Sequence, residues 1–165
     1  IVVARPFNTF GPRQSLRAVI PTIICQFLKN KKNRVRIKIG STSTKRDFVY
    51  VKDTVHGLIK IMQDKNNIGE IYNIATNCSH KISDIIKIVS QITKKKPLLN
   101  VIKQRKRSSE VFELKGSNNK LFKKTRWKPK YSNKSGFKKA LNETLRWFKD
   151  EENMKHYNNV NNYHI

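Results

Sequence analysis

The sequence predicts an α/β fold, in which the strands of a largely parallel sheet alternate with helices. Short apolar runs of the kind found in strands alternate along the chain with segments of helical periodicity. The first run, residues 1–4 (IVVA), is continuous rather than alternating, as in a parallel strand that is buried on both faces. The length of 165 residues suffices for one compact domain with its own core.

The elements of the first third follow from their periodicity. A turn is predicted at Gly11-Pro12. Apolar residues at helical spacing then predict a helix over 18–28, in which Pro21 is tolerable only because it lies in the first turn. Apolar and basic residues alternate over 35–39, which predicts a half-buried strand, and the polar loop 40–44 leads on to Arg46.

The middle of the chain predicts a strand, a helix and a second strand. Residues 47–51 form a short strand, after which Asp53 and Thr54 are suitable helix caps. We expect the helix to bury an apolar face made of Val55, Leu58, Ile59 and Met62. The polar turn 66–69 precedes the next strand, over 70–75.

The last part predicts a third helix after Ser83, an edge strand over 98–102 and a short helix over 118–124. An amphipathic helix over 135–150 follows, with its inward face formed by Phe137, Ala140, Leu141, Thr144, Leu145 and Phe148. The Asn-rich segment after residue 152 has little apolar periodicity. We therefore expect a domain over 1–152 and a disordered tail over 153–165.

The net charge of +25 at pH 7 would attract any polyanion. A basic nucleic-acid-binding module is therefore the alternative from another functional class. However, the lysines are scattered along the whole chain among many Asn and Ile residues, a mixture that an A/T-rich coding sequence produces without selection for a ligand. We do not expect nucleic acid as a partner.

The two cysteines, Cys25 and Cys78, stand far apart and form no CxxC or Cys/His pair at metal spacing, so we expect two buried thiols and no metal site. No signal peptide is recognisable, and no apolar run reaches the length of about 18 residues that spans a bilayer. We expect a cytoplasmic protein that does not enter membranes. Because the chain starts at Ile1, inside an apolar strand, we treat it as a fragment.

The residues needed for dinucleotide chemistry are missing from this sequence. No glycine-rich GxGxxG or GxxGxxG turn occurs, and no Tyr is followed four residues later by Lys. The four histidines have no evident nucleophile partner. We therefore predict no catalytic residue in this chain.

A ligand site is predicted in the segment 5–13 (RPFNTFGPR), which follows the first strand. The loop beyond the carboxyl end of a parallel strand is where α/β proteins bind ligands. Asn8 offers a donor and acceptors to a phosphate or a sugar hydroxyl. A purely structural turn explains Gly11-Pro12 but not the clustering of Asn8 with two arginines.

This segment resembles the RxxNxYGP motif of the extended short-chain dehydrogenase/reductase family, with Phe10 in the tyrosine position. Further family-like segments follow in order and at approximate spacing: 17–21 (RAVIP), 46–53 (RDFVYVKD) after Gly40, 72–75 (YNIA) and 127–129 (WKP). The resemblance implies the carboxy-terminal part of a Rossmann-type NAD-binding fold plus the small α/β substrate-binding domain.

The resemblance also implies roles for individual residues. Asn8 matches an Asn that contacts the sugar diphosphate, and Arg46 matches the Arg that clamps it, a task suited to a planar guanidinium. The remaining substrate-side residues are Arg13 near the reacting sugar, Ala18 and Val19 beside the diphosphate, Ile37 and Ile39 flanking the nucleotide base, Asn73 on the substrate side and Arg105 as a second phosphate ligand. Pro6 and Phe7 lie where the backbone approaches the nicotinamide. For Arg46, a structural salt bridge to Asp47 is the alternative; for Arg105, Arg107 offers a competing register.

Within the family, the sequence is most similar to nucleotide-sugar 4,6-dehydratases of the legionaminic-acid pathway type. Such an enzyme uses bound NAD to oxidise C4 of the sugar, eliminates water across C5 and C6 and returns the hydride to C6. The resemblance implies that this chain is the substrate-binding half, inactive alone, of a homodimeric parent that acts on a nucleotide-diphosphate sugar. A UDP-glucuronate decarboxylase or a sugar epimerase of the same family is the alternative.

Overall fold

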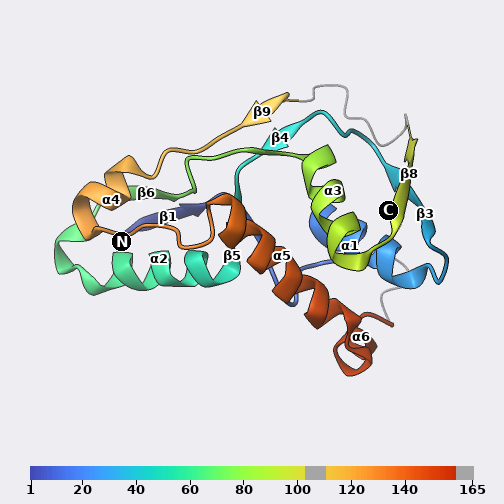
Figure 1. The fold of residues 1–165 in the computed structure, drawn as a ribbon. Helices are drawn as coiled ribbons and strands as arrows, with labels where there is room; N and C mark the ends of the chain where they lie inside the picture. The colour runs from blue at the N-terminus through green and yellow to red at the C-terminus, as the bar shows by residue number, and fades with distance from the viewer. Residues whose placement is uncertain (103–110, 159–165) are drawn as a thin grey trace. The chain divides into compact units, whose positions relative to one another are not determined.

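The computed structural model describes residues 1–102 and 111–158, and these residues confirm the α/β class (Figure 1). The chain forms two compact units. Unit 1 comprises Ile1–Phe10, Thr44–Lys81 and Val111–Ala140, and unit 2 comprises Gly11–Ser43, Ile82–Glu110 and Leu141–Ile165. Each unit collects segments from distant parts of the sequence.

Unit 1 contains two pairs of parallel strands. These are β1 (Val3–Pro6) with β6 (Ile71–Ile74), and β2 (Asn8–Phe10) with β5 (Phe48–Tyr50). In Figure 1, β1 and β6 run side by side along helix α2. The parallel pairing is as predicted, but the expectation that the first strand is buried on both faces is wrong. Val3 is 41% exposed and its partner Ile71 is 40% exposed, because β1 pairs only with β6 among the described strands.

Helix α2 (Val51–Gln63) is turned about its axis relative to the prediction. Of the expected inward residues, Val55, Ile59 and Met62 are exposed, and the face that is buried carries Gly57 and Ile61. Gly57 explains the rotation: a Cβ at this position would lie 3.1 Å from Ile74 Cγ2 and 3.3 Å from Trp127 Cε2. The absence of a side chain thus allows the helix backbone to approach the core closely.

Asp53 does not cap α2, contrary to the prediction. The helix begins at Val51, and its N-cap residue, Tyr50, makes no side-chain capping bond. The buried Asp53 carboxylate instead accepts hydrogen bonds of 2.9 Å from the backbone amides of Lys130 and Tyr131. Asp53 therefore ties the loop after the WKP segment to the first turn of α2, which gives that segment a structural role.

The core of unit 1 is formed by Val49, Ile61, Tyr72, Ile74, Leu121 and Trp127. Leu121 belongs to the short helix α4 (Asn119–Thr125), which packs against β6. The C-cap residue of this helix is Arg126, whose φ of 58° is left-handed and whose amide donates to the Phe122 carbonyl. The chain then turns so that the Trp127 ring, 1% exposed, enters the core.

A small three-stranded sheet in unit 1 holds Arg46. Its central strand is β4 (Lys45–Arg46), which pairs antiparallel with β7 (His80–Lys81) and parallel with β9 (Glu113–Leu114). The sequence predicts a loop running up to Arg46, but pairing on both sides makes this residue part of a sheet. Its backbone is therefore fixed more firmly than that of a loop residue.

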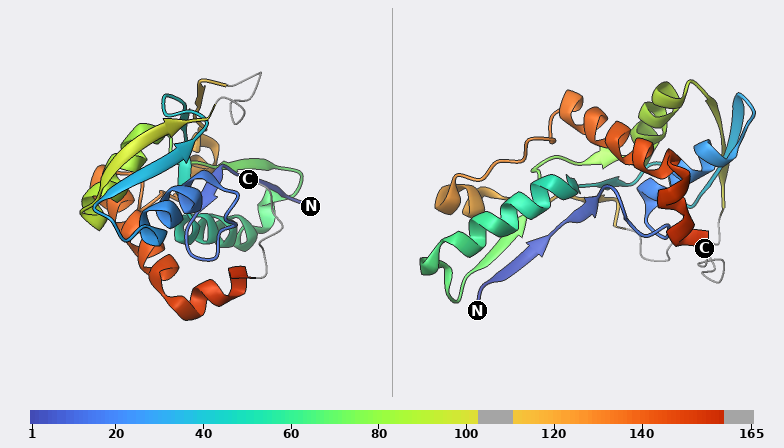
Figure 2. Two further views of the ribbon diagram at one scale, coloured as in Figure 1. Left: turned by 90° about the vertical axis from the view of Figure 1, so that its right-hand side faces the viewer. Right: turned by 90° about the horizontal axis from the view of Figure 1, so that it is seen from below.

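Unit 2 is built on one parallel pair of strands and the helices beside it. The elements are α1 (Val19–Lys29), β3 (Arg34–Ile39), α3 (Ile82–Thr93) and β8 (Lys96–Val101), and β3 pairs with β8 (Figure 2). Exposed and buried residues alternate strictly along β3, as predicted for a half-buried strand. Pro21 lies in the first turn of α1, as predicted, and the Lys95 ammonium donates to the Phe27 and Asn30 carbonyls at the other end of that helix.

Unit 1 also contains the short 3-10 helix η1 (Lys65–Asn67), which precedes β6. Two helices are the last elements of the described chain. The inward face predicted for α5 (Lys134–Lys149) is confirmed, since all of its members are buried. Helix α6 (Glu151–Asn158) occupies much of the segment predicted to be a disordered tail. There the Tyr157 hydroxyl donates to the Gln14 carbonyl at 3.2 Å, and its ring packs against Trp147 and Phe148. The rest of that tail, 159–165, lies outside the described residues.

The two thiols differ in environment, so they are expected to differ in reactivity. Cys25 is buried, as predicted, whereas Cys78 is only partly buried. Burial raises the pKa of the Cys25 thiol to about 11, and Lys29 opposes this shift weakly. With that pKa, only about one thiol in a thousand is ionised at pH 8. Iodoacetamide at pH 8 should therefore alkylate Cys78 first, and modification of Cys25 should need a higher pH or unfolding.

Intact-mass measurements on the Cys25→Ser and Cys78→Ser variants separate the two rates. Equal rates in the two folded variants would contradict the expected burial of Cys25.

Candidate functional site

Asn8 lies in unit 1 at the start of β2, opposite Phe48 of β5. Its side-chain amide, Nδ2, donates a 2.9 Å hydrogen bond to the backbone carbonyl of Asp47, the residue after Arg46. This bond joins Asn8 of β2 to the residue that directly follows Arg46 in the chain. The bond uses one Nδ2 hydrogen, which leaves the second hydrogen and the side-chain carbonyl of Asn8 able to bind a polar group.

Arg46 is partly buried, and its Nη1 donates a 2.7 Å hydrogen bond to the Lys45 carbonyl. Within residues 1–102 and 111–158, the Arg46 guanidinium forms no ion pair. The salt bridge to Asp47, which was the structural alternative, is thus not formed between these two described residues. The guanidinium keeps donors for an external anion, and a diphosphate is well matched to its planar fork.

The Asp47 carboxylate is fully buried and serves a structural purpose. It accepts hydrogen bonds from the Thr76 amide at 3.0 Å, the Thr76 hydroxyl at 2.6 Å and the Gly116 amide at 3.2 Å. Burial raises the pKa of the Asp47 carboxyl, and the hydrogen bonds from Thr76 and Gly116 act in the opposite direction. The carboxylate joins the end of β6 to the loop before α4.

Pro6 and Phe7, the residues expected beside the nicotinamide, link β1 to β2 in unit 1. Pro6 is exposed, whereas the Phe7 amide donates to the Ile74 carbonyl at 3.0 Å and the Phe7 ring lies against the core. The Phe7 ring also approaches Gly116 so closely that a Cβ on that glycine would lie 2.5 Å from Phe7 Cζ. Any group beside Phe7 would thus meet a rigid, packed segment.

Asn73, the other predicted ligand of unit 1, is opposite Arg5 in the β1–β6 pair and is partly buried. Its side chain makes no hydrogen bond with the part of the chain that the structure describes, so its amide is able to bind a ligand. No hydrogen bond among the described residues joins it to Asn8 or Arg46.

The predicted residues of unit 2 have mixed environments. Arg13 is exposed at a left-handed φ of 64°, Ala18 is the N-cap residue of α1, and Val19 is the first residue of that helix. The side chains of Ile37 and Ile39 are buried, at 0% and 7% exposure, so they belong to the core of unit 2. That they flank a nucleotide base stays a prediction. Arg105 and its competing register Arg107 lie outside the described residues.

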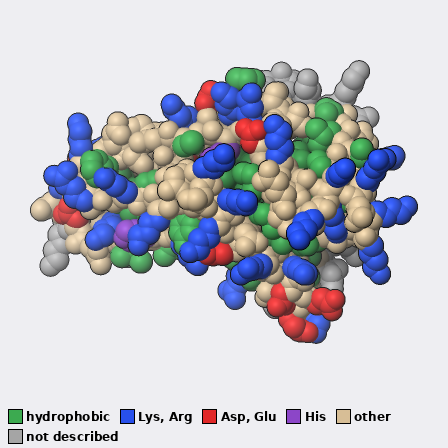
Figure 3. Space-filling view, in the orientation of Figure 1, with side chains coloured by type: hydrophobic (Ala, Val, Ile, Leu, Met, Phe, Trp, Pro, Cys, Tyr) green, Lys and Arg blue, Asp and Glu red, His purple; other side chains and the backbone are tan. Residues whose placement is uncertain are grey.

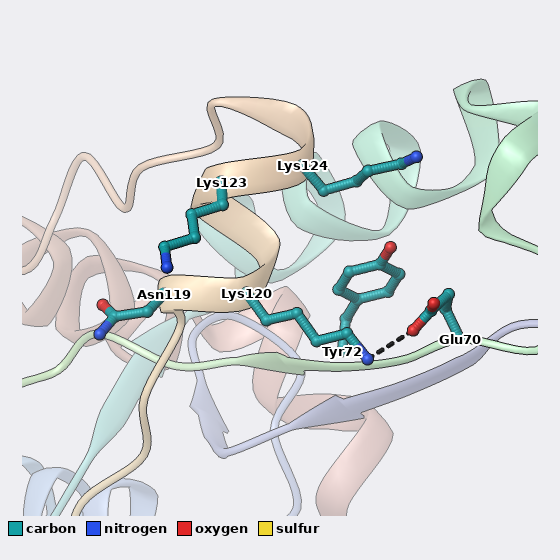
Figure 4. A pocket seen from close by; sticks show the side chains of 6 residues that line it. All are labelled: Glu70, Tyr72, Asn119, Lys120, Lys123 and Lys124. Atoms are coloured by element: carbon teal, nitrogen blue, oxygen red, sulfur yellow. Dashed lines mark ion pairs between the residues drawn. The ribbon is translucent and has the colours of Figure 1, made fainter.

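A pocket of about 490 Å³ in unit 1 contains none of the predicted ligand residues. Figure 4 shows its lining: Glu70, Tyr72, Asn119, Lys120, Lys123 and Lys124. The Lys120 ammonium lies 2.5 Å from Glu70 and over the Tyr72 ring, and Lys124 pairs with Asp64. Because two of its three cations are already paired, this pocket is a weak anion site.

The residues that sequence reasoning missed are the partners of Asp47. Thr76 and Gly116 are 29 and 69 residues away from it in sequence. One available signal was that Asp47 is the first acidic residue of the chain and directly precedes an apolar run. An isolated acid next to a buried strand indicates a carboxylate with internal partners.

Comparison with known proteins defines the class: nucleotide-sugar dehydratases, reductases and epimerases of the extended short-chain dehydrogenase/reductase type. GDP-6-deoxy-D-mannose reductase of Pseudomonas aeruginosa is 27% identical over 145 residues, covering 87% of this chain and 47% of the reductase. Human dTDP-D-glucose 4,6-dehydratase is 28% identical over 167 residues, covering 97% of this chain and 44% of the dehydratase.

Among solved structures, UDP-glucuronic acid 4-epimerase of Bacillus cereus, in complex with UDP-glucuronic acid and NAD, is similar with a TM-score of 0.79 and 27% identity, covering 90% of this chain and 45% of the epimerase. The GDP-mannose 4,6 dehydratase family model matches residues 1–140, so the chain belongs to this family. The chain spans about half the length of the curated relatives that it matches.

Within the described residues, no group of His, Cys, Asp and Glu side chains could hold a metal ion, and no helix has the length and apolar character of a membrane span.

Proposed function

We propose that this chain is the substrate-binding part of an NAD-dependent nucleotide-sugar 4,6-dehydratase, in which Asn8 and Arg46 bind the diphosphate of a nucleotide sugar. The observation that carries the proposal is the hydrogen bond from Asn8 to the Asp47 carbonyl. It places a polar amide next to the strand that carries a guanidinium without an ion pair among the described residues. A fixed cation and an amide side by side are suited to a phosphate oxygen.

Membership in the GDP-mannose 4,6 dehydratase family supports the dehydratase over a decarboxylase or an epimerase. The relatives named above include a reductase and an epimerase, so the reaction is part of the proposal, as are a homodimeric parent and a cytoplasmic location. The residues expected in unit 2 and Asn73 also belong to the proposal.

NAD, when bound, supplies a hydride acceptor for the sugar. The exposed residue Pro6 fits a contact with the nicotinamide, whereas the Phe7 amide already donates to the Ile74 carbonyl. The sequence contains no glycine-rich turn for the pyrophosphate and no Tyr/Lys pair. We therefore expect binding of the sugar nucleotide without turnover by this chain alone.

Calorimetric titration of the chain tests the proposal directly. GDP-mannose, dTDP-glucose and UDP-glucuronate are titrated separately, and free mannose and inorganic phosphate are the controls. At least one nucleotide sugar should bind saturably, and free sugar should not bind. If all three nucleotide sugars bind no better than inorganic phosphate, the proposal fails for this chain.

One observation favours the rival function of nucleic-acid binding. The outward face of the β3–β8 pair carries Arg34, Arg36 and Lys38, and Lys96 lies opposite Arg34. Alternate residues of a strand are about 6.6 Å apart, close enough to follow successive phosphates. Figure 3, however, shows Lys and Arg side chains spread over the visible surface rather than gathered in one stripe. That distribution agrees better with the compositional origin of the charge.

A competition experiment decides between the two functions. A fluorescein-labelled oligonucleotide is bound to the chain at low salt, and salt or nucleotide sugar is then added. Non-specific nucleic-acid binding should weaken by about a thousandfold or more between 50 and 200 mM salt if 6 or more phosphates are contacted. Nucleotide-sugar binding, which involves only two phosphates, should change far less. The rival function is supported if the oligonucleotide affinity falls steeply with salt and added nucleotide sugars fail to displace the oligonucleotide.

A further inference from the structure

Asp47 is the point at which the segments around the proposed diphosphate site are joined. Its carboxylate accepts from Thr76 and Gly116, its carbonyl accepts from the Asn8 side chain, and its amide donates to the Leu114 carbonyl at 2.8 Å. These partners come from β2, from the end of β6 and from the segment 114–116, which includes the end of β9 and the start of the loop before α4. One residue therefore fixes three chain segments that are distant in sequence.

The orientation of Asp47 also constrains Arg46. Successive side chains in an extended strand point to opposite faces. Because the Asp47 carboxylate is buried and held by three hydrogen-bond donors, the preceding side chain is directed to the opposite, more accessible face. Lys45 and Arg46 are both partly buried, so the direction of Arg46 is inferred from the alternation and not from its exposure.

We infer that Asp47 is a positioning residue for the binding of an anionic nucleoside diphosphate. Its carbonyl orients the Asn8 side chain, and its place in the backbone orients the Arg46 side chain. The inference rests on the proposed function of Asn8 and Arg46. Asp47 itself touches no ligand, since its carboxylate is enclosed by the protein. Its effect on affinity passes through the two residues that it orients.

Asp53 provides a matched control for this inference. It is also a buried aspartate of unit 1, at 2% exposure, and it also accepts hydrogen bonds from two backbone amides. Its partners, Lys130 and Tyr131, belong to the loop after the WKP segment, and no described hydrogen bond joins Asp53 to Asn8 or Arg46. A loss of stability alone should affect the two aspartates in the same way.

The test measures nucleoside diphosphate affinity and the state of the Asn8 amide in the full chain. GDP, UDP and dTDP are titrated into wild type, Asp47→Asn and Asp53→Asn. We expect both variants to melt at lower temperature, but only Asp47→Asn to lose affinity, by about tenfold.

The Asn8 side-chain NH₂ resonance, assigned with Asn8→Ser, should shift in Asp47→Asn and stay unchanged in Asp53→Asn. Thr76→Val removes the hydrogen bond from the Thr76 hydroxyl to Asp47 and should shift the Asn8 resonance in the same direction. This variant replaces Asp47→Asn in the test if Asp47→Asn does not fold.

The outcomes separate this inference from the proposed function. An Asn8 resonance unchanged in Asp47→Asn, or in Thr76→Val if Asp47→Asn does not fold, overturns the positioning role. So does an equal loss of affinity in Asp47→Asn and Asp53→Asn. If the wild-type chain binds none of the three nucleotides, the proposed function is overturned, and the Asn8 resonance still decides whether Asp47 orients that amide.

Discussion

Arg46→Ala is expected to weaken nucleotide-sugar binding by about 100-fold, which corresponds to about 2.7 kcal/mol. Arg46 lies on strand β4, which is paired on both edges, and among the described residues its guanidinium forms no ion pair with a carboxylate. Its removal therefore deletes a charge-assisted contact to the diphosphate without breaking an internal ion pair. Titration calorimetry with the nucleotide sugar that binds wild type best measures the change.

Two further substitutions show whether the guanidinium itself is responsible. Arg46→Lys keeps the positive charge but loses the planar fork, so about a tenfold loss is expected. Arg126→Gly removes the same charge from unit 1 at a position where φ is 58°, which glycine adopts readily. Its affinity should match that of wild type. Equal losses in Arg46→Ala and Arg126→Gly would show that only the overall charge matters, and Arg46 would then be removed from the site.

The fold was predictable from the sequence where burial follows a local period. In β3, basic and apolar residues alternate strictly, and in α5 the apolar residues repeat at helical spacing, so each inward face could be assigned without knowledge of its partner. The face of α2 was assigned wrongly because a hydrophobic pattern gives no weight to Gly57. The helix packs through that glycine, and Val55, Ile59 and Met62 remain outside.

Elements that depend on distant contacts could not be predicted in this way. Helix α6 has little apolar periodicity, yet Tyr157 donates to Gln14 from 143 residues away. The same holds for the candidate site. Asn8 and Arg46 were identified from a family resemblance, whereas Asp47 has a role only because Thr76 and Gly116 meet it in space. A sequence position does not reveal which amides will reach a buried carboxylate.

Gly116→Ala should destabilise the chain by about 3 kcal/mol, since overpacking in a core typically costs 1–3 kcal/mol or more. A Cβ at this position would lie 2.5 Å from Ala75 Cβ and 2.5 Å from Phe7 Cζ. Non-bonded carbon atoms prefer about 3.5–4.0 Å. The phenyl ring can turn, but a Cβ cannot move without its backbone, so the clash with Ala75 forces the chain to shift. Denaturant unfolding measures the loss.

Gly69→Ala is the matched control for the steric part of this effect. Gly69 has a left-handed φ of 83° and open space where a Cβ would lie, so its substitution costs only backbone strain, about 1 kcal/mol. A loss for Gly116→Ala no greater than that for Gly69→Ala would contradict the tight packing.

The double variant Gly116→Ala/Phe7→Ala separates the two clashes at Gly116. Removing the Phe7 ring relieves one clash and leaves the clash with Ala75 Cβ. In the Phe7→Ala background, Gly116→Ala should therefore lower the free energy of unfolding by less than it does in wild type, but not by zero. Full rescue would mean that the ring alone excludes a side chain at position 116. Partial rescue would mean that the backbone of 116 is held against Ala75, at the distance where its amide reaches the Asp47 carboxylate at 3.2 Å. The same close approach that excludes a Cβ thus completes the hydrogen bonds that hold the strand of Arg46.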